Sequence, residues 1–351
     1  MEVSAAEALS AEGLAARLAQ LPRVRLAHLP TPLEKMERLT AHLAGDRGGP
    51  ALWIKRDDCT GLGLGGNKVR KLEFLLADGM AKGADTVVSG GVIQSNHARQ
   101  TAAAAAKLGL GCHLALMTGR VPDVDADYDA TGNILLDRLF GARCTLFDWK
   151  SDRNAVIGGL MDELGRQGKR PYMVPYGGSS ALGACGFAAA AVELARQIAT
   201  MGCRVTHVVH ASGSAGTQAG LAVGLSAVAP AIELIGIDID AEPARVRGDV
   251  DRVAGETAKL LGVAPPPPVT VVAGYAGPGY GIPTQAMVEA VRLGARLEGL
   301  VLDPVYSGKG FAGLLDLVRQ GRFARSDQVL FWHTGGAPGL FAYRSAFARD
   351  S

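Results

Sequence analysis

Gly65-Gly66-Asn67-Lys68 sets a lysine directly behind two glycines, at the start of an apolar repeat that runs to Met80. The repeat has helical spacing, so we expect Lys68 to stand in or just before the first turn of a helix. A helix N-terminus already carries partial positive charge, and burial would destabilise the ammonium form further. The stretch therefore indicates a nucleophilic amine suited to Schiff-base chemistry. The alternative is an ordinary solvated lysine.

The bulk composition is that of a globular α/β protein. The chain has 351 residues, 48% of them hydrophobic and 20% charged, with 47 glycines, so two packed units are expected. A net charge of +2 gives no reason to expect a nucleic acid or an acidic membrane as a partner. We also find no apolar run of membrane-spanning length. Five widely spaced cysteines without a C-x-x-C pair argue against disulfides and zinc, and favour the cytoplasm.

Short β-rich runs alternate with longer helical patterns, which predicts parallel sheets crossed over by helices. The predicted strands are Leu52–Lys55, Thr86–Ser89, Cys112–Met117, Cys144–Phe147, Tyr172–Val174, Val205–Ala211, Leu234–Asp238, Val269–Ala273 and Val329–His333. The predicted helices are a short N-terminal one around Leu14 and Leu18, Ala98–Leu108, Gly132–Leu139, Gly183–Thr200, Thr217–Val228, Val250–Leu261 and Thr284–Glu298. In such sheets, ligands bind at the carboxyl ends of the strands.

The loop Ser212–Thr217 follows a predicted strand and opens an apolar helix. Unpaired N–H groups at a helix N-terminus bind phosphate, and glycines let the phosphate come close. The hydroxyls of Ser214 and Thr217 add donors. The alternative is a plain turn with a serine or threonine cap.

A second junction, Gln94-Ser95-Asn96-His97, opens an alanine-rich helix. Its N–H groups suit a smaller anion such as a carboxylate. The alternatives are an N-cap with solvent-facing neighbours and a structural role for His97. The loop His333–Gly336 after the last strand is expected to form part of a pocket wall.

The glycines of Gly61–Gly66 match G-x-G-x-x-G, the dinucleotide fingerprint. In that fold the glycines follow the strand at once and an acidic residue ends the next strand. Here Arg56–Thr60 intervene between the strand and the first glycine, and Asp85 opens the next strand instead of ending it. We therefore reject an NAD-dependent oxidoreductase.

A Schiff-base lysine, a phosphate loop and a carboxylate loop together describe a site for pyridoxal 5'-phosphate. The chain resembles the fold-type II pyridoxal-phosphate enzymes, in the branch of D-cysteine desulfhydrase, L-cysteate sulfo-lyase and 1-aminocyclopropane-1-carboxylate deaminase. The resemblance runs from Leu29 nearly to the C-terminus. It rests on Leu29–Glu34, Ile54–Asp58, Gly65–Lys71, Gln94–Arg99, Ser212–Thr217, Pro278–Pro283, Asp303–Gly308 and His333–Gly336.

The resemblance implies a tryptophan synthase β-like fold with two open, twisted, mainly parallel sheets flanked by helices. It implies a large cofactor-binding domain, 1–70 and 179–351, a small domain, 71–178, and a homodimer. Lys68 would bond covalently to the cofactor and shuttle the substrate's α-proton. The residues implied to hold the cofactor phosphate are Ser214, Ala215, Gly216 and Thr217.

Five further residues receive roles from the resemblance. Asn96 would hydrogen-bond the phenolic oxygen of the cofactor. Ser95, Asn96 and His97 would bind the carboxylate of a small amino-acid substrate. Tyr280 and Tyr306 would face the substrate and assist proton transfer or steer the leaving group.

Ser307 separates the chemistries within the branch. The deaminases carry a glutamate there, which keeps the pyridine nitrogen protonated. A serine hydroxyl can only hydrogen-bond a neutral nitrogen, and the weaker electron sink favours expulsion of a β leaving group. We therefore predict a carbon–sulfur lyase that releases pyruvate and ammonia from D-cysteine or L-cysteate. A deaminase and a non-catalytic cofactor-binding homologue are the alternatives.

The leaving group and the hand of the substrate stay open at this point. Three stretches resemble the L-cysteate lyases more closely, namely Ala27–Pro32, Trp53–Leu62 and His210–Ser214. A sulfonate would need additional donors, for which His97, Arg99 and Arg120 are candidates. The alternative for Arg99 is a solvated helix residue.

Overall fold

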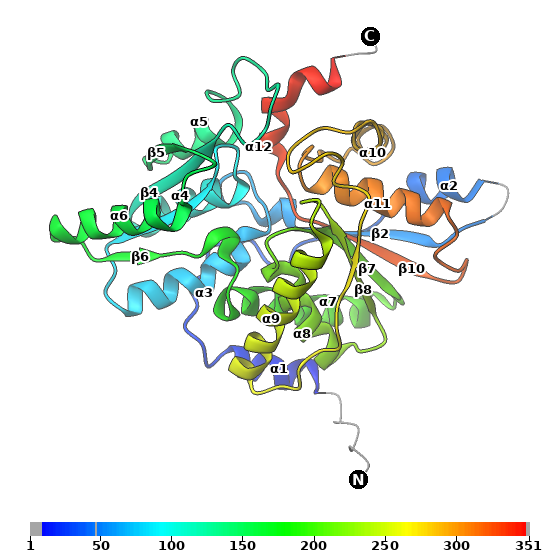
Figure 1. Ribbon diagram of the computed structural model, residues 1–351. Helices are drawn as coiled ribbons and strands as arrows, with labels where there is room; N and C mark the ends of the chain where they lie inside the picture. The colour runs from blue at the N-terminus through cyan, green and yellow to red at the C-terminus, as the bar shows by residue number, and fades with distance from the viewer. Residues whose placement is uncertain (1–8, 46–47, 349–351) are drawn as a thin grey trace.

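Two separate sheets organise the chain in the computed structural model, which describes residues 9–45 and 48–348 (Figure 1). The larger sheet has six strands in the order β1-β2-β10-β7-β8-β9. Strand β1 is antiparallel to β2, and the other neighbours are parallel. Its strands are β1 Leu33–Lys35, β2 Ala51–Arg56, β7 His207–Ser212, β8 Glu233–Asp238, β9 Thr270–Val272 and β10 Gln328–His333.

The smaller sheet has four parallel strands in the order β5-β4-β3-β6. They are β3 Thr86–Val92, β4 Gly111–Thr118, β5 Arg143–Asp148 and β6 Pro171–Met173. All four fall inside the range 71–178 that we predicted for the small domain. The two-sheet α/β architecture is confirmed, whereas the domain bounds stay a prediction and their outer ends lie beyond the described residues.

Helices cover both sheets. On the six-stranded sheet, α2 (Glu37–Ala44), α10 (Gln285–Glu298) and α11 (Ser307–Arg319) form one layer, and α7 (Ala181–Met201) and α8 (Gly216–Val228) form the other. Helices α1 (Ala11–Leu18) and α9 (Pro243–Leu261) pack outside α7 and α8. On the four-stranded sheet, α4 (Asn96–Leu108) and α5 (Gly132–Leu139) lie opposite α6 (Arg153–Arg166).

Two helices connect the two halves of the molecule. Helix α3 (Lys68–Ala81) packs against α7 on one side and α4 on the other. Near the C-terminus, α12 (Ala337–Leu340) follows the last strand of the large sheet and contacts α5 (Figure 1). The residues that begin these two helices therefore lie between the sheets.

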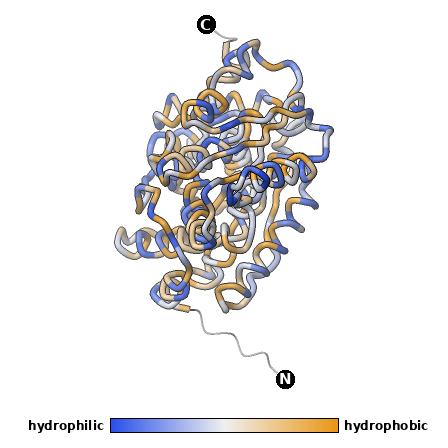
Figure 2. Tube along the Cα trace, turned by 90° about the vertical axis from the view of Figure 1, so that its left-hand side faces the viewer, coloured by the Kyte–Doolittle hydropathy of each residue, from blue (hydrophilic) through white to orange (hydrophobic). Residues whose placement is uncertain are grey.

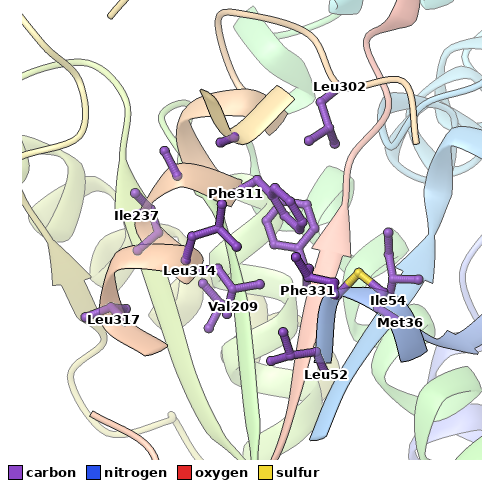
Figure 3. Packing of buried hydrophobic residues seen from close by; sticks show 14 of the residues in the cluster. Met36, Leu52, Ile54, Val209, Ile237, Leu302, Phe311, Leu314, Leu317 and Phe331 are labelled. Atoms are coloured by element: carbon purple, nitrogen blue, oxygen red, sulfur yellow. The ribbon is translucent and has the colours of Figure 1, made fainter. Parts of the chain in front are cut away.

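A core of interlocking apolar side chains fixes α11 on the large sheet (Figure 3). The rings of Phe311 on α11 and Phe331 on β10 meet edge to face, with centroids 5.0 Å apart. Val209 and Ile237 from β7 and β8 fill the space beside them. Because α11 begins at Ser307, this packing positions the segment that carries Tyr306 and Ser307.

Helix α7 corrects one prediction from the sequence. Its 21 residues have a mean hydropathy of 1.2, so by length and composition it could cross a membrane, contrary to our expectation. Most of its apolar residues are buried against α3, α8 and α9, as in the core helix of a globular protein. Blue and orange segments alternate along the trace in Figure 2, and α7 owes its high hydropathy to a run of alanines.

Close helix packing at Gly220 predicts a specific stability effect. A Cβ at Gly220 on α8 would lie 2.1 Å from the carbonyl oxygen of Ala184 on α7. We expect Gly220→Ala to lower the free energy of unfolding by about 1–3 kcal/mol, because the backbones must separate. Denaturant unfolding measures the change. Gly248→Ala on α9 is the control, because an added Cβ there meets open space. Equal stability of the two variants would contradict the prediction.

Candidate active site

Lys68 is the first residue of α3, as the sequence predicts. The side chain of Gln100 on α4 anchors this helix start, since its Oε1 accepts from the backbone N–H groups of Lys68 (2.8 Å) and Val69 (3.1 Å). The side chain of Asn67 does not cap the helix but donates to Thr217 Oγ1 at 3.0 Å. The lysine segment is thereby fastened to both the carboxylate junction and the phosphate loop.

The two glycines before Lys68 are required by a tight turn. Gly65 and Gly66 have φ values of +71° and +129°, in the region that favours glycine. A Cβ at Gly65 would lie 1.8 Å from the carbonyl oxygen of Asp58. Thr60 closes the turn, with its Oγ1 accepting from the N–H of Gly66 at 2.8 Å.

A buried ion network holds the first turn of α3. Arg70 donates to both carboxylate oxygens of Asp57 and also pairs with Glu193. Trp332 of β10 donates its indole N–H to Asp57 at 2.9 Å. Because Asp57 and Arg70 are fully buried, removing either partner would leave an uncompensated charge in the core.

A cavity of about 420 Å³ opens between the two sheets, beside the carboxyl ends of their strands. Most of the residues that we predicted for the site line it: Lys68, Ser95, Asn96, His97, Ser214, Ala215, Thr217, Tyr280 and Tyr306. Gly216 lies in the same loop. Ser307 and Arg99 are fully buried behind the cavity wall, so the interpretation of Arg99 as a solvated residue is wrong.

Burial lowers the pKa of Lys68 to about 8, and the more distant carboxylate of Asp303 opposes this effect only in part. A large fraction of the side chain is therefore a neutral amine near pH 8. A neutral amine is the form that attacks a carbonyl group. The desolvation inferred from the sequence is thus present at the predicted position.

Lys71, one turn after Lys68, is a site residue that the sequence analysis missed. It is fully buried, and burial together with the charge of Lys68 holds its pKa well below the usual range. Its Nζ donates to the carbonyl oxygen of Gly177 at 3.1 Å and lies 3.1 Å from where a Cβ on Gly216 would stand. The sequence offers no signal for this, because Lys71 looks like any other lysine on a helix.

The loop Ser212–Thr217 forms a cradle where α8 begins. Ala215 has φ +68°, which bends the loop so that α8 starts at Gly216. The hydroxyl of Ser212 is buried and has no hydrogen-bond partner among the described residues. The start of α8 and the adjacent Nζ of Lys71 together make a strongly anion-attracting corner.

The junction Ser95–His97 presents a second, smaller anion site. Ser95 caps α4 by accepting from the N–H of Ala98 at 3.2 Å, so its own proton is free to donate into the cavity. His97 Nε2 pairs with Ser89 Oγ at 2.9 Å. Burial and the nearby lysines hold the pKa of His97 well below its usual range, so the imidazole is neutral.

Tyr280 and Tyr306 stand at the cavity with their hydroxyls hydrogen-bonded to each other. Burial raises both pKa values well above 10, so both phenols keep their protons near neutral pH. The guanidinium of Arg120 lies 4.2 Å from the ring centroid of Tyr280 and pairs with Asp240 at 2.8 Å. Arg120 thus lines the cavity between Asp240 and the ring of Tyr280.

The hydroxyl of Ser307 donates to Asp303 at 2.7 Å. The same carboxylate also accepts from the backbone N–H groups of Val305, Tyr306 and Ser307 and so holds the start of α11. A hydrogen bond from Ser307 to a pyridine nitrogen would require this hydroxyl to leave Asp303, and it stays a prediction. Thr334, in the loop that we predicted as pocket wall, lines the cavity itself.

This fold and this site define the class of protein. The chain belongs to the pyridoxal-phosphate dependent enzyme family, whose sequence model matches residues 24–335. The cofactor of this protein is accordingly pyridoxal 5'-phosphate.

Relatives narrow the branch. The chain is 48% identical over 328 residues to a D-cysteine desulfhydrase of Yersinia enterocolitica, covering 93% of this chain and 97% of the relative. It is 47% identical over 326 residues to a D-cysteine desulfhydrase of Salmonella choleraesuis, with the same coverage. A solved structure described as an ACC deaminase homologue superposes with a TM-score of 0.86 at 37% identity, covering 95% of this chain and 98% of that one.

The residues present fit the cofactor. A phosphate suits the cradle at the start of α8 beside Lys71, and an aldehyde suits the neutral amine of Lys68. The buried hydroxyl of Ser212 lies on the cavity wall and has no hydrogen-bond partner among the described residues. It can therefore donate a hydrogen bond to a bound cofactor.

We expect Lys68 to react with the aldehyde over an unusual pH range. The neutral fraction of an amine rises as the pH passes its pKa, so the bonding rate of pyridoxal phosphate to the apoprotein should level off just above pH 8. An ordinary lysine would keep accelerating beyond pH 10. Stopped-flow absorbance gives the profile, and borohydride reduction followed by peptide mapping identifies the residue. Lys68→Ala should abolish the link, whereas exposed Lys82→Ala should keep it. Labelling of another lysine would refute the assignment.

The phosphate corner predicts a selective loss of affinity in Lys71→Met. Lys71 lies beside the start of α8, and a phosphate bound there would stabilise its protonated form, so removing its side-chain nitrogen should weaken the binding of pyridoxal phosphate about tenfold or more. Pyridoxal, which lacks the phosphate, should bind to the variant and to the wild type alike. Equilibrium titration with both ligands measures the two constants. An equal loss for both ligands would mean that Lys71 acts only on folding.

Proposed function

We propose that the protein is a β-eliminating carbon–sulfur lyase that converts D-cysteine into pyruvate, ammonia and sulfide. The observation that carries the proposal is the neutral serine at position 307, whose hydroxyl donates to Asp303, together with Tyr280 and Tyr306, which keep their protons near neutral pH. The relatives named D-cysteine desulfhydrase, at 46–48% identity, support the same chemistry and favour D-cysteine as the substrate.

Lys68 and the start of α4 orient and activate the amino acid. The substrate carboxylate would accept from the Ser95 hydroxyl and the first N–H groups of α4, where the helix dipole adds attraction. Bound pyridoxal phosphate supplies an electron sink that makes the substrate's Cα–H bond acidic. Lys68 Nζ, with its pKa of about 8, is suited to accept that proton.

Tyr280 and Tyr306 stabilise the sulfur leaving group. As the Cβ–S bond breaks, its electron pair stays on sulfur, and a protonated phenol of Tyr280 or Tyr306 can donate to it. Their raised pKa values keep both phenols protonated near neutral pH, so they are available as hydrogen-bond donors to the sulfur and not as bases. The released aminoacrylate hydrolyses to pyruvate and ammonia.

L-Cysteate is the second candidate substrate. Three sequence stretches resemble the L-cysteate lyases, and Arg120 in the cavity lining could attract a sulfonate, although Asp240 already pairs with it. A deaminase acting on 1-aminocyclopropane-1-carboxylate is the alternative reaction, supported by the likeness to the ACC deaminase homologue. A non-catalytic homologue is disfavoured, since Lys68, the phosphate cradle and both tyrosines meet at one cavity.

We also propose a homodimer in the cytoplasm. The resemblance to dimeric members of the branch supports the homodimer. The five unpaired cysteines support a location in the reducing cytoplasm. Light scattering of the purified protein measures its molar mass in solution and so tests the oligomeric state.

A substrate panel tests the reaction. D-cysteine, L-cysteine, L-cysteate, 3-chloroalanine and 1-aminocyclopropane-1-carboxylate are each incubated with the holoenzyme. We expect D-cysteine to give equal amounts of pyruvate, ammonia and sulfide, and Lys68→Ala to give none. Sulfite from L-cysteate alone would select the second candidate. Turnover of the cyclopropane alone, with 2-oxobutyrate as the product, would overturn the elimination chemistry.

A further inference from the structure

The side-chain amide of Asn96 is held in one orientation. Its Oδ1 accepts two hydrogen bonds, one from Arg99 Nη1 at 3.0 Å and one from Asn133 Nδ2 at 3.0 Å. A carbonyl oxygen has two lone pairs, so both are used. The NH₂ group must therefore point the other way. Asn96 lines the cavity, and its Nδ2 lies 2.9 Å from where a Cβ on Gly336 would stand.

Asn133 has its own orientation imposed by Gln94. Its backbone N–H donates to Gln94 Oε1 at 2.8 Å, and its Nδ2 donates to the backbone oxygen of Gln94 at 3.0 Å. Its Oδ1 accepts from Arg99 Nη1 at 2.8 Å. Neither end of the Asn133 amide can be exchanged without losing several hydrogen bonds at once.

Arg99 joins this network to the lysine loop. It is fully buried, and its Nη2 donates to the carbonyl oxygen of Gly65 at 2.6 Å. Among the described residues no carboxylate lies within ion-pair distance, and Asp137 and Asp303 attract it only from farther away. A buried guanidinium that contacts only neutral acceptors is costly, so it is expected to serve the site.

We propose that Arg99 and Asn133 are positioning residues that aim the NH₂ group of Asn96 at the phenolic oxygen of the cofactor. The phenolic oxygen carries negative charge in the bound cofactor, so a donor facing it forms a charge-assisted bond. A reversed amide would place a carbonyl oxygen against that charge. This inference rests on the cofactor and is independent of the substrate.

The experiment measures binding of pyridoxal phosphate to purified apoprotein. In Asn133→Asp the volume is kept, but a carboxylate oxygen replaces the donor to Asn96 Oδ1 and repels it, so the Asn96 amide loses one of the two hydrogen bonds that orient it. Arg99→Gln removes the other donor. We expect each variant to bind about tenfold more weakly, as for a lost bond to a charged group. Arg138→Gln, at an exposed position on α5, removes the same charge and should bind like the wild type.

An analogue separates positioning from folding. With 3-deoxypyridoxal phosphate, which lacks the phenolic oxygen, Asn133→Asp, Arg99→Gln and the wild type should bind within about twofold of one another. In an Asn96→Ala background the two substitutions should likewise add little, because coupled residues are non-additive. If either variant does not fold, the other decides. Equal losses for both ligands, full additivity with Asn96→Ala, or unchanged binding of pyridoxal phosphate would overturn the proposal.

Discussion

Two lysine ammonium groups, one helical turn apart at a helix N-terminus, share the interior between the sheets. Among the described residues neither Lys68 nor Lys71 has a carboxylate within ion-pair distance, and each lowers the stability of the other's charged form. Because no carboxylate balances the positive charge of a protonated lysine here, a bound anion is stabilised. A lysine that stays neutral can act as a nucleophile. Binding of phosphate and reactivity of the amine are therefore two results of one charge imbalance.

The surrounding fold holds the start of α3, which carries Lys68 and Lys71, in its position between the sheets. The ion pair between Asp57 and Arg70 fixes the first turn of α3 on one side. Gln100 of α4 fixes it on the other side, through hydrogen bonds to its backbone N–H groups. The turn at Gly65 prevents the lysine loop from swinging outward, since it passes within contact of Asp58. The helix backbone that carries both lysines is thereby held in place, so the lysines cannot reach bulk water by a shift of the start of α3 without disrupting the buried Asp57–Arg70 pair.

Much of this was accessible from the sequence. Each predicted strand is present, with its ends displaced by three residues or fewer, because β-branched apolar runs between turns are a local signal. The short edge strand β1 and helices α2, α6 and α11 were not predicted, and α9 begins seven residues before the predicted Val250. In α11, Gly308 and Gly310 hide the helical pattern, and both glycines are required by close packing.

The residues of the candidate site likewise fall into those that the sequence could predict and those that it could not. Lys68 and the loops at Ser95 and Ser214 could be found because glycines, caps and strand ends mark them locally. Lys71 could not be found, and Arg99 was considered only as a sulfonate donor or a solvated residue, because their contacts with Gly177 and Gly65 are made by tertiary folding. The hydroxyl partner of Ser307 was equally hidden, since Asp303 looks like a loop residue in the sequence.

Asp303 constrains how this active site could evolve. Its carboxylate already neutralises the N-terminal dipole of α11 and receives the hydroxyl at position 307. Introducing the acidic side chain of the related deaminases there would set two carboxylates against each other in a dry environment. Because two adjacent buried carboxylates disfavour each other's ionisation, an acidic residue at position 307 is expected to require a compensating change near Asp303.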